Sequence, residues 1–168
     1  TLNVKTRICA DRPFGLGLRL GNEAAKQLGD GQRLAEFKDF LEANQLYAFT
    51  INGFPYGPFH GQPVKENVYL PDWRMAERAE YSMRLGDILA ALLPEGVAGS
   101  ISTVPVGYSK NIRTSEDYER VAQNLAASVA ALARLHADKG ADICLALEPE
   151  PDCVVEKTED MVRFYNKK

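Results

Sequence analysis

The sequence contains few of the groups that would commit it to redox, nucleic-acid or membrane chemistry. Its three cysteines are widely spaced and form no C-x-x-C pair, which indicates neither a zinc site nor a disulfide framework. No run of Lys and Arg stands out and the net charge is -3, so no basic surface for nucleic acid is expected. No apolar stretch approaches the roughly 20 residues that span a bilayer. We therefore expect a cytoplasmic protein that neither inserts into a membrane nor binds nucleic acid.

Nucleotide-binding signatures are also missing. The pair Gly15 and Gly17 lacks the third glycine and the helix start of a dinucleotide fingerprint, and no P-loop is present. The 168 residues fall in the usual range of one domain, without a linker or low-complexity tract. A single domain over residues 1–168 is expected.

Apolar segments alternate with helical patterns along the chain. Short apolar runs typical of buried strands occupy residues 14–20, 46–51, 99–106 and 143–147. Helical spacing of apolar residues covers 23–41 in two parts, 72–93 and 115–139, and a further helix begins at Thr158, with Asn22, Asp72 and Ser115 as expected caps. Strands separated by helical crossovers predict an α/β fold with parallel strands.

A long loop follows the second predicted strand. Residues 54–71 contain five prolines and glycines among aromatic side chains up to Pro63, and Pro71 closes the segment. Such a composition sustains neither a helix nor a central strand. Because long loops after strands often carry function, this segment is a candidate for part of a site.

Glu148 is the clearest candidate functional residue. It follows the apolar run 143–147 directly, and barrel enzymes present metal ligands and acid–base groups at the carboxyl ends of such strands. The alternative is a carboxylate that caps the next loop or pairs with an arginine. Glu150, between Pro149 and Pro151, can direct a second carboxylate to the same place or be simply solvated.

Three further polar residues have weaker patterns. Asn52 ends its predicted strand before Gly53, where it can bind a polar substrate or form an ordinary Asn-Gly turn. His60 lies in the aromatic loop and can bind metal, orient a hydroxyl or move a proton, or else be structural. His136 lies on the apolar stripe of a helix, where packing or capping is expected.

Several longer motifs together resemble one family. They are residues 50–57 (Thr-Ile-Asn-Gly-Phe-Pro-Tyr-Gly), 59–61 (Phe-His-Gly), 68–73 (Val-Tyr-Leu-Pro-Asp-Trp), 99–105 (Gly-Ser-Ile-Ser-Thr-Val-Pro) and 147–153 (Leu-Glu-Pro-Glu-Pro-Asp-Cys). They are similar to the EboE-like metabolite-traffic proteins of the xylose-isomerase-like TIM-barrel superfamily. The resemblance covers nearly the whole chain.

The resemblance implies a partial (β/α)8 TIM barrel. The strands found here would be the second to the fifth, so the first strand and the C-terminal half, with the remaining metal ligands, would lie outside this chain. Glu148 would bind a divalent metal (Mn, Mg or Zn), His60 and Glu150 would be catalytic, and Asn52 and Tyr56 would contact a small sugar or polyol. A half barrel exposes two sheet edges, which predicts self-association and no activity of its own.

Three functions follow as expectations. The first is a metal-dependent sugar isomerase or epimerase, in which the metal polarises a carbonyl while His60 or Glu150 moves a proton. The second is a non-catalytic metabolite-binding or transport-accessory protein, since a fold alone does not establish activity. The third is an AP-endonuclease-like phosphodiesterase, against which the acidic composition counts.

Overall fold

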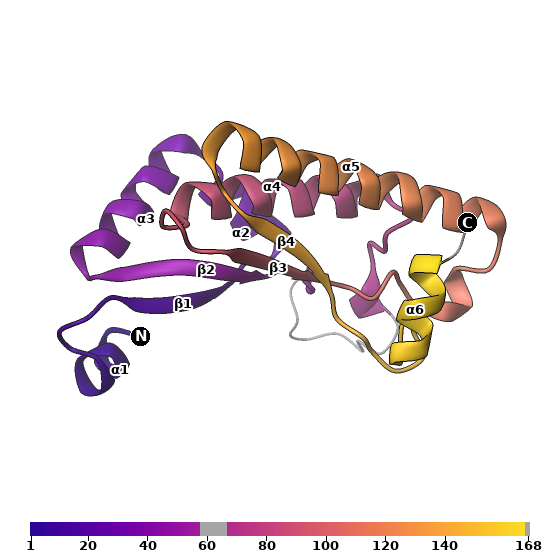
Figure 1. The fold of residues 1–168 in the computed structure, drawn as a ribbon, viewed down its shortest axis with the longest axis horizontal. Coiled ribbons are helices and arrows are strands. Elements are labelled where there is room, and N and C mark those ends of the chain that lie inside the picture. The colour runs from indigo at the N-terminus through magenta and orange to yellow at the C-terminus, as the bar shows by residue number, and fades with distance from the viewer. Residues whose placement is uncertain (58–66, 167–168) are drawn as a thin grey trace.

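The fold is α/β, as the alternation of strands and helices predicted. The computed structural model describes residues 1–57 and 67–166. In chain order it contains α1 (Leu2–Ile8), β1 (Phe14–Arg19), α2 (Asn22–Leu28), α3 (Gly31–Ala43), β2 (Leu46–Asn52), the 3-10 turn η1 (Asn67–Tyr69), α4 (Ala76–Leu92), β3 (Gly99–Thr103), the 3-10 turn η2 (Ser109–Asn111), α5 (Ser115–Lys139), β4 (Ile143–Leu147) and α6 (Thr158–Asn166). Figure 1 shows the sheet with α3, α4 and α5 stacked along one side of it.

The four strands form one parallel sheet in the order β1-β2-β3-β4. Each new strand is therefore added on the same side of the previous one. Because βαβ crossovers are right-handed in nearly all proteins, adding strands in one direction places the crossover helices on the same face. The opposite face has no covering helix layer among the described residues (Figure 1). These four strands make an open sheet, and a closed barrel is not shown.

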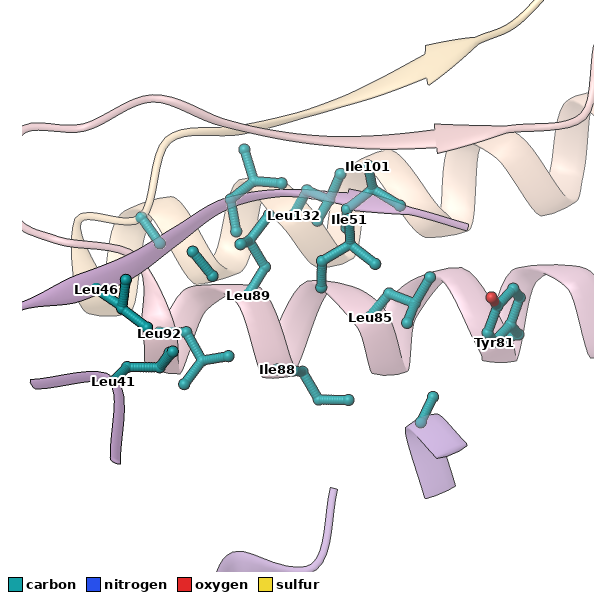
Figure 2. Close-up of a cluster of buried hydrophobic side chains, with 14 residues drawn as sticks. Leu41, Leu46, Ile51, Tyr81, Leu85, Ile88, Leu89, Leu92, Ile101 and Leu132 are labelled. Atoms are coloured by element: carbon teal, nitrogen blue, oxygen red, sulfur yellow. The ribbon is translucent and has the colours of Figure 1, made fainter. Parts of the chain in front are cut away.

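The sheet–helix core fills the space between the sheet and the helices. Leu85 and Leu89 of α4 point toward Ile51 and Ile101 on the strands, whereas Ile88 lies on the other side of the helix, as Figure 2 shows. The buried members of this core are Ala25, Leu41, Leu46, Ala48, Ile51, Tyr81, Leu85, Ile88, Leu89, Leu92, Ile101, Leu132, Ala141 and Ile143. Nearly all are aliphatic and come from the periodic segments that the sequence identified. Burying each leucine or isoleucine contributes about 1.5–3 kcal/mol.

Strand β2 contains a bulge. Leu16 of β1 pairs with Ala48, but the next residue, Gly17, pairs with Thr50, so Phe49 is the extra residue. Ala48 and Ile51 are both fully buried against the helices although three positions separate them. A regular strand alternates its faces at every residue, so the bulge reverses the alternation of β2 after Ala48.

The ends of several elements differ from the expectation by one to a few residues. Strand β3 ends at Thr103, and Val104 to Val106 belong to the following loop instead of the strand. Residues Thr114 and Asp117 form a reciprocal capping box at the start of α5, so Thr114 is the cap in place of Ser115. Gly140 ends α5 with φ 69°, a left-handed conformation suited to glycine.

Two other expected caps are also wrong. Asn22 is the first residue of α2, after Gly21. Helix α4 starts at Ala76 after Met75, and Asp72 is fully buried. The Asp72 carboxylate accepts hydrogen bonds from Arg74, where Nη2 lies 2.7 Å from Oδ2 and the backbone N–H lies 3.0 Å from Oδ1. Asp72, a short polar residue before the helix, therefore forms an ion pair with Arg74 and does not cap α4.

In the described part of the chain, no helix is both long enough and apolar enough to cross a membrane.

Candidate functional site at the carboxyl edge of the sheet

The carboxyl ends of the four parallel strands lie along one edge of the sheet. The register places Arg19, Asn52, Ser102 and Ala146 in one row across β1, β2, β3 and β4. Glu148 lies two residues beyond Ala146 on the same side of its strand. The edge expected from the sequence to carry the site therefore brings Asn52 and Glu148 to the same face of the sheet, two strands apart.

This face is the one that no described helix layer covers. Ile51 and Ile101 are fully buried against the helices, so their neighbours Asn52 and Ser102 point the opposite way. One row earlier, the hydroxyl oxygens of Thr50 and Ser100 lie 2.8 Å apart. Small polar groups thus line the uncovered face near the carboxyl edge, where they can form hydrogen bonds to a polar ligand.

Glu148 continues the strand ladder by one residue. Its backbone N–H donates to the Thr103 carbonyl at 3.0 Å, which fixes the backbone just past the end of β4. The side chain is partly exposed, and no residue of 1–57 or 67–166 forms a hydrogen bond or an ion pair with its carboxylate. The alternative roles of loop cap and rim ion pair therefore find no partner in the described residues.

Asn52 is exposed, and its Oδ1 accepts the Phe54 backbone N–H at 3.2 Å. The following Gly53 is required by close packing and not by a turn. A Cβ at residue 53 would lie 2.6 Å from Leu85 Cδ1 and 2.9 Å from the Ser102 carbonyl oxygen. Gly53, the second residue of the Asn-Gly pair, therefore allows β2 to pack closely against α4 and β3.

Tyr56, expected to contact substrate, packs inside the loop. Its ring lies edge-on to the Tyr81 ring at 5.2 Å between centroids, and its carbonyl accepts the Asn22 N–H at 2.9 Å. The side chain is half-buried. The structure therefore shows a packing contact for Tyr56, whereas a substrate contact stays a prediction.

Glu150 has different neighbours from those of Glu148. Its N–H donates to the Val155 carbonyl at 3.2 Å, which closes a tight loop after β4. Burial, the largest cause, together with the nearby Cys153, Glu150 and Asp152 raises the pKa of Tyr69 to about 12. The Glu150 carboxylate is thus a neighbour of Tyr69 and Cys153, and its expected catalytic role stays a prediction.

Of the two histidines, only His136 lies among the described residues, and the structure does not bring it to this site. His60 lies outside the described residues. His136 is exposed near the end of α5, where its carbonyl accepts the Gly140 N–H. Because the end of α5 leads directly into the start of β4, this histidine lies toward the opposite edge of the sheet. We expected His136 to pack against other residues or to cap the helix, whereas the structure shows its side chain exposed to solvent.

A second apolar cluster, the loop core, lies at the carboxyl edge. It joins the loops after β2, β3 and β4, which the backbone also links: the Trp73 N–H donates to Val106 O at 3.0 Å, and the Val154 N–H donates to Gly107 O at 3.0 Å. Its buried members are Phe54, Tyr69, Trp73, Ala79, Val104, Val106, Tyr108, Ile112, Val121, Cys153 and Val155. The loops around the candidate site are therefore fixed to one another.

The loop core carries several signs of an unusual environment. Val106 has φ 70°, a conformation that β-branched residues rarely adopt and that costs about 1–3 kcal/mol. Burial raises the pKa of the Cys153 thiol to about 11. Trp73 Nε1 and Thr103 Oγ1 are buried without a hydrogen-bond partner in the described part of the chain. Such strain and unsatisfied polar atoms are commonest near functional sites.

Arg78 also belongs to this edge, although the sequence pattern did not single it out. It is fully buried on α4 and donates to backbone carbonyls of the loops beside Asn52. Its position could have drawn attention, because residues 78, 81, 85, 88 and 92 share one helical stripe on which all the others are apolar or aromatic.

A hollow of about 560 Å³ lies next to the end of β4. It is lined by Pro149, Glu156, Lys157, Thr158, Glu159 and Met161, between the residue after Glu148 and the start of α6. Its volume falls in the range of about 300–1,000 Å³ that small-molecule sites occupy. Its wall contains both acidic and basic side chains, Glu156, Glu159 and Lys157.

The residues that the structure describes contain no group of three or more His, Cys, Asp or Glu side chains that could hold a metal ion. Glu148 alone does not make a metal site. Comparison with protein-family models, with curated proteins and with solved structures finds no match to this chain. The site's chemistry therefore has to be argued from its geometry.

Proposed function

We propose that the carboxyl edge of the sheet binds a small sugar or polyol, in a protein similar to the metal-dependent sugar isomerases and epimerases. One observation carries this proposal: Glu148 and Asn52 lie on the same uncovered face of the sheet, and the carboxylate of Glu148 has no partner among the described residues. A parallel α/β sheet binds its ligands at the carboxyl ends of its strands.

The side chains on this face match a molecule with many hydroxyl groups. A carboxylate accepts hydrogen bonds, an amide both donates and accepts, and the paired hydroxyls of Thr50 and Ser100 do both. The net charge of -3 does not favour a polyanionic ligand such as nucleic acid. A neutral polyhydroxylated metabolite is therefore the ligand class we infer, and a phosphodiesterase is disfavoured.

The proposed metal needs ligands beyond those described. Divalent ions in such enzymes take several oxygen or nitrogen ligands, and only Glu148 is offered here as one of them. In the proposed barrel, the other ligands come from strands that this chain does not contain or from His60. When bound, the metal would supply polarisation of a sugar carbonyl. The Glu148 backbone is held at the end of β4 by its bond to Thr103, and we propose that Asn52 binds an oxygen-rich ligand.

The proposed barrel would also account for the uncovered face. Four parallel strands wound in one direction, with helices on one side, form about half of a (β/α)8 barrel. Both outer strands, β1 and β4, have no strand partner on their outer side among the described residues. We propose that the isolated chain self-associates through these sheet edges and has no activity of its own, because unpaired parallel strands readily pair with another copy. The three free cysteines fit a reducing, cytoplasmic location, which is likewise proposed.

A non-catalytic metabolite-binding protein is the second candidate. The observation that favours it is the absence of a three-residue metal cluster among the described residues, together with loops that the loop core holds rigidly. A rigid polar surface is sufficient to bind a metabolite, whereas isomerisation also requires groups that move protons.

Calorimetry distinguishes the two candidates. We would titrate Mn²⁺, and then D-xylose and xylitol, into the full-length protein and into its Glu148→Gln and Glu95→Gln variants. Glu95 is exposed in the turn between α4 and β3 and serves as the matched control. Loss of Mn²⁺ binding in Glu148→Gln alone would support the metal-dependent function. Sugar binding without Mn²⁺ binding would leave a metabolite-binding protein, and binding of neither would contradict both.

A further inference from the structure

Arg78 is a buried cation on the side of α4 that faces the loops. Its side chain has no exposed surface, although arginine is rarely buried without a carboxylate partner. No carboxylate in the described residues forms an ion pair with it; Asp72 is paired with Arg74. Burial lowers the pKa of Arg78 to about 10, which leaves the guanidinium charged at neutral pH. A leucine at position 78 would continue the apolar stripe of α4 without burying a charge, so the presence of an arginine requires a specific explanation.

The contacts of Arg78 supply that reason. Its Nε donates to the Pro71 carbonyl at 2.7 Å, and its Nη1 donates to the carbonyls of Gly53 at 2.9 Å and Phe54 at 3.2 Å. The guanidinium also lies over the rings of Tyr56 and Tyr81, 5.8 and 5.6 Å from their centroids. One side chain therefore fixes both ends of the loop that follows β2. The guanidinium presents these donors in a fixed planar geometry, while its Nη2 is buried without a hydrogen-bond partner among the described residues.

The next step leads from Phe54 to Asn52. The Phe54 carbonyl accepts from Arg78, and the Phe54 N–H donates to Asn52 Oδ1 at 3.2 Å. Because a backbone donor occupies Oδ1, the orientation of the Asn52 amide is determined: its Nδ2 group is the end left for another partner. No residue in the described ranges accepts a hydrogen bond from Nδ2, and the side chain is exposed.

We propose that Arg78 is a positioning residue: it fixes the Gly53–Phe54 peptide and thereby presents the Asn52 side-chain N–H groups as hydrogen-bond donors to an oxygen of the ligand. The ligand atom is a hydroxyl, carbonyl or carboxylate oxygen, because only an acceptor satisfies Nδ2. This inference rests on the proposed function for the identity of the ligand, and it specifies that the ligand accepts a hydrogen bond at β2.

The positional part is tested by hydrogen exchange measured with NMR on the wild type and on Arg78→Met, Arg78→Lys and Arg84→Met. Arg84 lies on the same helix and donates to the Asn22 side chain at 3.1 Å, so its substitution is a matched control. In Arg78→Met we expect the amides of Gly53 and Phe54 to exchange at least tenfold faster than the overall loss of stability explains. Arg78→Lys should be intermediate and Arg84→Met unchanged at these two amides.

A uniform change at all amides, equal to that of Ile101 in β3, would show a merely structural role and overturn the positioning role. If Arg78→Met does not fold, the same comparison in Arg78→Lys decides. The Asn52 side-chain signals give a second readout: they should be single and rigid in the wild type and averaged in the Arg78 variants.

The donor part is tested by adding D-xylose, xylitol or acetate to the wild type while observing the Asn52 Nδ2 signal, assigned by its loss in Asn52→Asp. A shift with at least one of these probes supports the donor role, and no shift with any of them overturns it. Neither result depends on a metal, so the Mn²⁺ titration of Glu148→Gln can fail or succeed independently of this inference.

Discussion

The sheet–helix core and the loop core are held together in different ways. In the sheet–helix core, Leu85, Leu89 and Ile101 come from regular elements and are fully buried. In the loop core, Tyr69, Trp73 and Val155 come from irregular segments linked by hydrogen bonds between loops. Both cores are apolar, but the first packs regular helices and strands, whereas the second packs loop residues, many of them aromatic, around the candidate site. The molecule thus separates the region that stabilises it from the region that holds the candidate site.

The largest expected effect comes from the sheet–helix core. Leu89→Ala removes a fully buried side chain of α4 and should lower the free energy of unfolding by about 2–5 kcal/mol, because a cavity remains. Chemical denaturation followed by circular dichroism measures this change. The control is Val129→Ala on α5, a side chain that is 54% exposed, which should change stability by no more than about 0.5 kcal/mol.

A comparable change in the loop core should cost less. Val155→Ala removes two buried methyl groups and should lower the free energy of unfolding by about 1–3 kcal/mol. We also expect faster hydrogen exchange at Glu150 and Val154, whose amides donate to the carbonyls of Val155 and Gly107, and little change in β2. If Val155→Ala cost more than Leu89→Ala, the proposed division between the two cores would be wrong.

A smaller effect should appear in acid, at the polar boundary of the loop core. The backbone N–H groups of Thr114 and Arg113 hold the pKa of Asp117 well below its usual value, and Arg74 adds to this. A lowered folded-state pKa stabilises the protein above the ordinary value of about 4, and this stabilisation is lost as the pH falls below it. The stability difference between the wild type and Asp117→Asn should therefore be full at pH 7 and shrink below pH 4.

Thermal unfolding between pH 2.5 and pH 7 measures that difference. Glu119→Gln, an exposed change on the same helix, is the control and should show no such trend. If the stability difference between the wild type and Asp117→Asn were constant over this range, the negative charge of Asp117 would not contribute. Its role would then be limited to helix capping, which aspartate and asparagine can both provide.

The smallest effect is chemical and does not alter the fold. Cys144 is exposed on the uncovered face of β4, whereas Cys153 is buried in the loop core with its pKa raised to about 11. Since the thiolate is the reactive form, iodoacetamide at pH 8 should modify Cys144 well before Cys153. Mass spectrometry of the peptides follows both. Equal rates would mean that the loop core opens as readily as the surface.

The contrast between the cores also explains what could be predicted from the sequence. The four strands and the helices of the sheet–helix core were identified because their apolar residues repeat with the periods of strands and helices, and β4 was placed at residues 143–147. The loop core was not anticipated, because Phe54, Tyr69 and Val155 have no common period and meet only in three dimensions. Only a long loop rich in proline and glycine indicated that something lay there.

For the candidate site, the sequence placed Glu148 and Asn52 at strand ends on the basis of position alone. It did not indicate Arg78, since charged residues of a helix usually lie on the surface and α4 contains four others. It also misjudged Asp72, which resembled a helix cap and instead pairs with Arg74. Arg78 has its most distant partner 25 residues away, at Gly53 in the loop after β2, and such a pairing cannot be derived from local spacing. Asp72 and Arg74 are only two residues apart, but the short spacing did not distinguish an ion pair from a helix cap.

The extra residue at Phe49 has a consequence for how strands can change over evolution. Without the bulge, a strand with the same seven residues would direct Thr50 and Asn52 into the helices and Ile51 away from them. The bulge therefore determines which face of the sheet each following residue of β2 points toward. Straightening the bulge with all seven residues kept would exchange the faces of every residue after Ala48 at once, whereas deleting Phe49 itself would leave Thr50, Ile51 and Asn52 on their present faces.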